Sequence, residues 1–151
     1  ESGCVDLVDM EYFEEEKPAA KIRHLQKQGI KVVASHHDFD ETPSIDVMKM
    51  LLVQMSMGGA DVVKLAVMPQ DEMDVLNLLT ATAEFHHDNK EIPLITMSMG
   101  GLGSISRLCG ETFGSCVTFG AGKKASAPGQ FERKDLAEML ELIHKSNPKK
   151  E

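Results

Sequence analysis

A lysine inside an apolar run is the first residue whose setting suggests chemistry. Lys64 is the single charged residue between Val62 and Met68, and this run, bounded by Gly59 and Pro69, predicts a strand buried on both faces. Burial disfavours the ammonium form, so Lys64 is a candidate nucleophile that would form a Schiff base with a carbonyl compound. The alternative is a lysine near a strand end whose stem carries the charge out to water.

Two adjacent histidines lie at the end of the preceding predicted strand, 31–39. Because side chains alternate along a strand, His37 can face the same interior as Lys64, whereas His36 points to the opposite face. A lysine nucleophile beside a histidine suits imine chemistry, which needs several proton transfers. The alternative is a surface or core histidine. A metal site is not favoured, because no third ligand is spaced with the pair.

Further polar groups follow the later predicted strands. The glycine-rich turn 100–103 can form an anion-binding nest ahead of a short helix that carries Arg107. If the turn aims it inward, the guanidinium would be a fork for a carboxylate. The Gly-, Ser- and Pro-rich segment 122–130, with Ser126 and Gln130, predicts either a mobile loop at the site or an ordinary connector.

The elements that must position these groups alternate between strand and helix. The predicted strands are 5–10, 31–39, 62–68, 93–99 and 116–120. Each is followed by a helical pattern, so five βα units are expected to form a parallel sheet covered by helices. The sheet would be either the last five units of an eight-stranded barrel or a complete open, doubly wound sheet. Both architectures place function at the carboxyl ends of the strands.

The first and second units contain two local signals. Asp9 and Glu11 lie on one face at the end of the first predicted strand. Thr42 and Pro43 are predicted to be the N-cap and the first-turn proline of the second helix.

Composition excludes several classes of function. The chain has 151 residues and 42% hydrophobic content, which fit one domain with a real core. Its 16 Lys and Arg residues against 24 Asp and Glu residues give a net charge of −8, which argues against nucleic-acid binding. No apolar run approaches the roughly 18 to 20 residues of a membrane span. Three cysteines without CxxC spacing argue against a disulfide framework or zinc site and favour a reducing compartment.

Four separated blocks carry a resemblance to a known family. They are 35–44 (SHHDFDETPS), 64–70 (KLAVMPQ), 93–99 with 105–108, and 118–121 with 125–130. In this order they resemble the signature segments of type I 3-dehydroquinate dehydratases, the Schiff-base dehydroquinases of the shikimate pathway. The resemblance implies a (β/α)8 TIM barrel of which residues 1–151 form the C-terminal part, about the last five βα units, with no internal domain boundary. The chain is therefore expected to be a piece of a longer protein.

The resemblance also implies roles for individual residues. Lys64 would form the imine, His37 rather than His36 would shuttle protons, and Arg107 would grip the substrate carboxylate. The other implied pocket residues are Ser126 and Gln130 on a closing loop, and Met97 and Phe119 on the walls. The glutamate that orients the histidine is expected from earlier strands outside this chain.

The function implied by the resemblance is that of a lyase that dehydrates 3-dehydroquinate to 3-dehydroshikimate. The enzyme would be a cytoplasmic homodimer that needs neither a metal nor an organic cofactor. One alternative is another Schiff-base barrel lyase, such as an aldolase that holds a sugar phosphate with the glycine turn. A second is an inactive fragment that only binds or associates through its sheet edges. Five units cannot close an eight-stranded barrel, so the isolated piece is expected to have little activity.

Overall fold

One parallel sheet organises the molecule, in the strand order β1-β2-β3-β4. The structure is a computed structural model that describes residues 4–146. The predicted domain covers 1–151, so its residues 1–3 and 147–151 lie outside the described residues. The strands are β1 (Leu7–Glu11), β2 (Lys31–His37), β3 (Val62–Val67) and β4 (Leu94–Ser98). All three neighbouring pairs are parallel, as the alternation of elements predicts.

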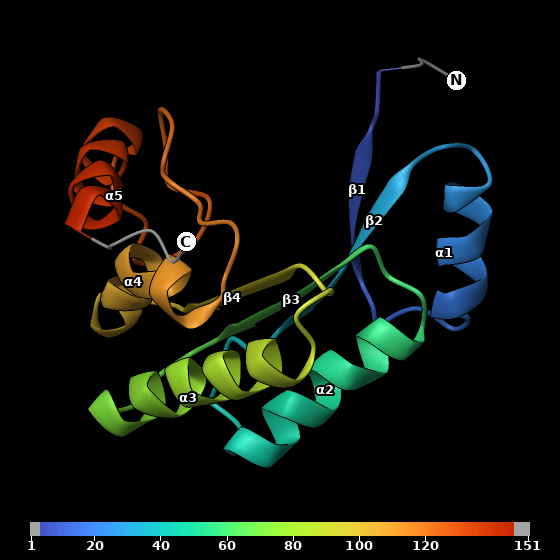
Figure 1. Cartoon of the computed structure of the whole chain (residues 1–151), viewed down its shortest axis with the longest axis horizontal. Helices are drawn as coiled ribbons and strands as arrows, with labels where there is room; N and C mark the ends of the chain where they lie inside the picture. Colours follow the sequence, from blue (N-terminus) through green and yellow to red (C-terminus); the bar gives the residue numbers. More distant parts are fainter. Residues whose placement is uncertain (1–3, 147–151) are drawn as a thin grey trace.

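Helices connect and flank the strands. They are α1 (Pro18–Gln26), α2 (Ile45–Met57), α3 (Glu72–Asp88), the short 3-10 helix η1 (Leu102–Ser104), α4 (Ile105–Phe113) and α5 (Arg133–Ser146). Figure 1 shows α2 and α3 side by side along the sheet, α1 beside β1 and β2, and α4 and α5 beyond β4. Within residues 4–146, the five predicted α-helices are present.

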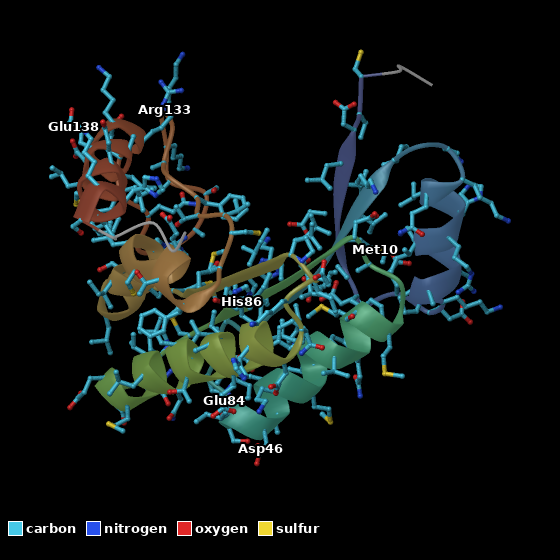
Figure 2. The ribbon with its side chains drawn as sticks, in the orientation of Figure 1. Met10, Asp46, Glu84, His86, Arg133 and Glu138 are labelled. Carbon is cyan, nitrogen blue, oxygen red and sulfur yellow. The ribbon has the colours of Figure 1, made fainter. Side chains whose placement is uncertain are left out.

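The main core lies between the sheet and helices α2 and α3. The buried side chains of this core come from both layers and include Val63, Leu65, Val67, Met48, Leu52, Met55, Leu78 and Phe85. On β1, Met10 packs with Ile22 of α1 and Val32 of β2, and Figure 2 shows Met10 on the side of α1. Alternation therefore sends Asp9 and Glu11 to the opposite face of the sheet.

The prediction of a fifth strand over 116–120 is wrong. Only an isolated bridge joins Ser115 to Leu94, supported by a hydrogen bond of 2.7 Å from Cys116 N to Leu94 O. The next amide of β4, Thr96 N, donates to the Ser115 hydroxyl at 3.0 Å and not to a backbone carbonyl. The serine side chain thus takes the place of a ladder bond, and the segment leaves the sheet after one pair.

The predicted start of the second helix is also wrong. Its N-cap is Ser44, one residue after Pro43, and Thr42 lies outside the helix. The Thr42 hydroxyl donates to Met68 O at 3.0 Å, and Met68 N donates to Glu41 O at 3.1 Å. Thr42 therefore ties the loop after β2 to the end of β3, where the candidate site lies.

Candidate active site

Strand register sets which side chains share the face opposite helices α2 and α3. Ser35 pairs with Lys64, and His37 pairs with Ala66. Paired residues of neighbouring strands point to the same face, so the predicted common orientation of Lys64 and His37 is confirmed. Ala66 also pairs with Met97 of β4, which extends this face across three strands.

Six of the seven predicted site residues line one pocket of about 240 Å³ at this face. Its lining consists of His37, Phe39, Lys64, Ala66, Met97, Met99, Phe119, Ser126, Ala127 and Gln130. Residues from β2, β3 and β4 and from the loop before α5 meet there, at the carboxyl ends of the strands. This is where parallel α/β proteins carry their functional groups.

Lys64 is buried but is not the isolated cation that its apolar strand predicts. Its Nζ donates to Asp9 Oδ2 at 2.7 Å, and the lysine side chain is 10% exposed. The amine also lies 5.3 Å from the centre of the Phe119 ring, a cation–π contact. The ion pair spans β2, where the small Ser35 lies in register with Lys64. The pairing holds the amine at a defined point of the pocket.

His37 is oriented by Glu11, whose carboxylate accepts from both its ring and its backbone. The Nδ1–Oε2 distance is 2.7 Å, and His37 N donates to Oε1 at 3.0 Å. An ionised carboxylate only accepts, so Nδ1 carries the proton and Nε2 of the neutral ring is left as a base. The ring also stacks on Phe39, with centroids 5.8 Å apart and planes at 9°. The ring of His37 is therefore held in one orientation by Glu11 and Phe39.

The contact with Glu11 gives His37 a partner that the sequence analysis did not assign. A glutamate from strands outside this chain is also expected to orient His37, and Glu11 of β1 is a carboxylate within the chain that contacts it directly. His36 does not line the pocket, but its Nδ1 lies 3.2 Å from the same Glu11 carboxylate. Sequence reasoning located Asp9 and Glu11 on one face of the first strand but gave neither a role. The missing information was the strand register, which no local pattern encodes.

Arg107 lies beside the pocket rather than in its lining. Its side chain is buried, with the residue only 1% exposed, and burial lowers the pKa of its guanidinium from the usual value. One terminal nitrogen donates to Met97 Sδ at 3.4 Å and the other to Pro128 O at 3.1 Å. Within residues 4–146 its Nε has no partner and no carboxylate pairs with it. A buried cation without a counter-ion favours an anionic ligand.

The loop 122–130 is seated over the pocket by polar and backbone contacts. Ser126 N donates to Gln130 Oε1 at 2.9 Å, and Gln130 Nε2 donates to the Ser126 hydroxyl at 3.0 Å. The Pro128 carbonyl is held by Arg107. Gly129, with a φ of +75°, lies so close to Gly100 that an added Cβ would be 2.0 Å from the Gly100 oxygen.

The variant Gly129→Ala is expected to unseat this loop. The new Cβ would meet backbone atoms in a left-handed conformation, a strain of about 1 to 3 kcal/mol or more. Hydrogen exchange of the amides in 122–130, measured by mass spectrometry, should accelerate by about tenfold or more. Gly122→Ala is the matched control, because its Cβ would meet nothing within 4 Å. Equal exchange in both variants would show that the Gly129–Gly100 contact does not hold the loop.

Neither a metal-binding group of side chains nor a membrane-spanning helix is found in the described part of the chain. Residues 4–146 hold no group of three or more His, Cys, Asp or Glu side chains that could bind a metal ion. In the same range, no helix combines the length and apolar character needed to cross a bilayer.

Solved structures share this fold. A crystal structure of 3-dehydroquinate dehydratase from Geobacillus kaustophilus HTA426 superposes with a TM-score of 0.93 at 43% identity, over 97% of this chain and 57% of that one. A type I 3-dehydroquinate dehydratase from Clostridium difficile, solved with covalently modified comenic acid, superposes with a TM-score of 0.90 at 48% identity, over 97% and 58%. The parallel α/β fold is thus that of type I dehydroquinase (β/α)8 barrels, of which this chain covers about 57%.

Sequence relatives agree with the structural matches. The 3-dehydroquinate dehydratase of Clostridioides difficile (strain 630) is 49% identical over 146 residues, which are 96% of this chain and 57% of that protein. The enzyme of Listeria monocytogenes (strain EGD-e) is 51% identical over 146 residues, 95% and 57% respectively. The chain therefore spans a little over half the length of the relatives it matches. The family model for type I 3-dehydroquinase matches residues 1–147, and the chain belongs to the type I 3-dehydroquinase family.

Proposed function

We propose that the protein carrying this chain is a 3-dehydroquinate dehydratase, which eliminates water from 3-dehydroquinate to give 3-dehydroshikimate. The observation that carries the proposal is the single pocket that Lys64 and His37 share, each held by its own carboxylate. Membership of the type I 3-dehydroquinase family supports the choice of substrate. So do relatives of about half-identical sequence that bear the name 3-dehydroquinate dehydratase.

Lys64 and His37 divide the chemistry. The Lys64 amine attacks the ketone carbon, and loss of water gives an imine that acts as an electron sink. Nε2 of His37 removes the proton from the carbon beside the imine, and the departing hydroxyl leaves as water after it is protonated. Hydrolysis of the imine then releases the enone product and restores the amine. The imine supplies the electron sink, so this route uses neither a metal nor an organic cofactor.

The remaining predicted residues bind and enclose the substrate. Arg107 binds its carboxylate, which would supply the missing counter-ion of the buried guanidinium. Ser126 and Gln130 contact the substrate from the closed loop, and Met97 and Phe119 form apolar walls. Covalent modification in the C. difficile enzyme's structure supports a pocket built for covalent chemistry.

We further propose that residues 1–151 form the C-terminal part of a single (β/α)8 domain in a cytoplasmic homodimer. The support is the family itself and the 57% of relatives' length that the chain covers. The alternative of a sugar-phosphate aldolase has less support. That alternative would use the glycine turn 100–103 to hold a phosphate. Packing already accounts for a glycine in this turn, because an added Cβ on Gly103 would lie 2.4 Å from the backbone of Ser98.

A direct assay tests this proposal. The natural protein is mixed with 3-dehydroquinate, and formation of the conjugated enone is followed by its ultraviolet absorbance. We expect turnover with 3-dehydroquinate and none with a ketose bisphosphate. Cleavage of the ketose bisphosphate without reaction of 3-dehydroquinate would favour the aldolase instead. Assayed alone, the 151-residue chain is expected to have little activity.

A further inference from the structure

We propose that Asp9 is a further catalytic residue, one that exchanges a proton with the Lys64 nitrogen during imine formation and then serves as the counter-ion of the protonated imine. This inference rests on the proposed function and extends it. Asp9 of the first strand would transfer protons to and from the Lys64 nitrogen, whereas His37 removes the proton from the carbon beside the imine.

The hydrogen bonds at β1 support this separation. Asp9 Oδ2 lies 2.7 Å from Lys64 Nζ, and it is the only hydrogen-bond partner of Nζ within residues 4–146. Glu11, the next carboxylate on the same face of β1, is occupied by the ring and backbone of His37 and by the ring of His36. Each carboxylate of β1 therefore serves a different reacting group.

The surroundings of the Lys64 nitrogen favour proton exchange with the Asp9 carboxylate. The Lys64 side chain is only 10% exposed, so water has little access to its nitrogen, and the Asp9 carboxylate is the group placed to take its proton. The ring of Phe119, 5.3 Å from Nζ, also favours a cation at this point, whether ammonium or protonated imine.

The step balances without any further reagent. First, the Lys64 ammonium gives a proton to the Asp9 carboxylate, which leaves a neutral amine and a carboxylic acid. The amine forms a bond to the ketone carbon, and transfer of one of its protons to the former carbonyl oxygen gives a neutral carbinolamine. Asp9 then returns its proton to that hydroxyl group, the C–O bond breaks, and water leaves. The products are the protonated imine, one water molecule and the Asp9 carboxylate, now the counter-ion of the imine.

Rapid trapping of the imine measures this step. The natural protein and its variants are mixed with 3-dehydroquinate and quenched with borohydride at successive times, and the reduced adduct on the Lys64 peptide is quantified by mass spectrometry. We expect Asp9→Asn to slow adduct formation by about 10²-fold, the usual lower size of a general acid–base contribution.

Three comparisons separate a chemical role from a structural one. Asp9→Glu keeps the carboxylate and should recover much of the natural rate. Asp6→Asn removes one charge from the exposed residue just before β1. In this variant the adduct on the Lys64 peptide should form at the natural rate. Thermal melting of each variant checks that it folds.

The outcomes are distinguishable. A natural rate in Asp9→Asn would overturn the inference. So would a slow rate that Asp9→Glu does not restore, which would assign Asp9 to structure alone. A natural protein that turns over 3-dehydroquinate but yields no adduct would overturn the Schiff-base mechanism and this inference with it. A natural protein with neither turnover nor adduct would show that the proposed function itself fails.

Discussion

Replacing Lys64 by methionine is expected to abolish turnover of 3-dehydroquinate. Methionine has a similar length and apolar stem, so it fits the strand, but it supplies no amine to form the imine. The variant should remain folded. Lys64 lies in an apolar strand, so a methionine side chain suits its surroundings. Steady-state assays and thermal melting measure the two effects separately.

The matched control for this variant is Lys49→Met. Lys49 lies on α2 and forms a surface ion pair of 2.6 Å with Glu84 of α3, well outside the pocket lining; Figure 2 labels Glu84 on α3. This change should leave turnover at the natural level, since surface ion pairs contribute about 0 to 1 kcal/mol to stability. Substantial turnover by Lys64→Met would contradict the assignment of Lys64 as the nucleophile.

Replacing His37 by alanine is expected to lower turnover by about 10²-fold or more, the size of a general acid–base contribution. The imine should still form, because Lys64 and Asp9 are untouched. His36→Ala should lower turnover much less, since His36 does not line the pocket and shares with His37 only the Glu11 carboxylate. Turnover assays together with borohydride trapping compare the two variants. Equal losses at both positions would show that the pair works as one unit through Glu11.

Much of the fold could be predicted because its signals are local. The apolar run around Lys64 and the 3.6-residue spacing of buried residues in α3, from Val75 to Phe85, identified a buried strand and a packed helix. Alternation along each strand allowed Lys64 and His37 to share one face, and the register of β2 with β3 confirms that they do.

The errors arose where side chains compete with expected backbone patterns. The Ser115 hydroxyl takes the amide of Thr96 and ends the fifth predicted strand after one pair. The Thr42 hydroxyl binds the carbonyl of Met68 and therefore does not cap α2. Both bonds join segments 19 or more residues apart in sequence, so no local pattern could reveal them.

The carboxylates of the site were the largest omission. Asp9 reaches Lys64 across the whole of β2, over a sequence separation of 55 residues. Their meeting depends on two strand registers at once, Asp9 with Val33 and Ser35 with Lys64. The sequence presented Lys64 as a lone buried cation, whereas the three-dimensional sheet supplies its counter-ion.

The central claim is that Lys64 forms the covalent bond to substrate, and mapping the reduced adduct tests it most directly. The natural protein is incubated with 3-dehydroquinate and borohydride, digested, and analysed by tandem mass spectrometry. We expect one modified peptide, with the added mass on Lys64 and none on Lys49 or Lys31. A protein that turns over 3-dehydroquinate yet carries no modification at Lys64, or carries it on another lysine, would contradict it.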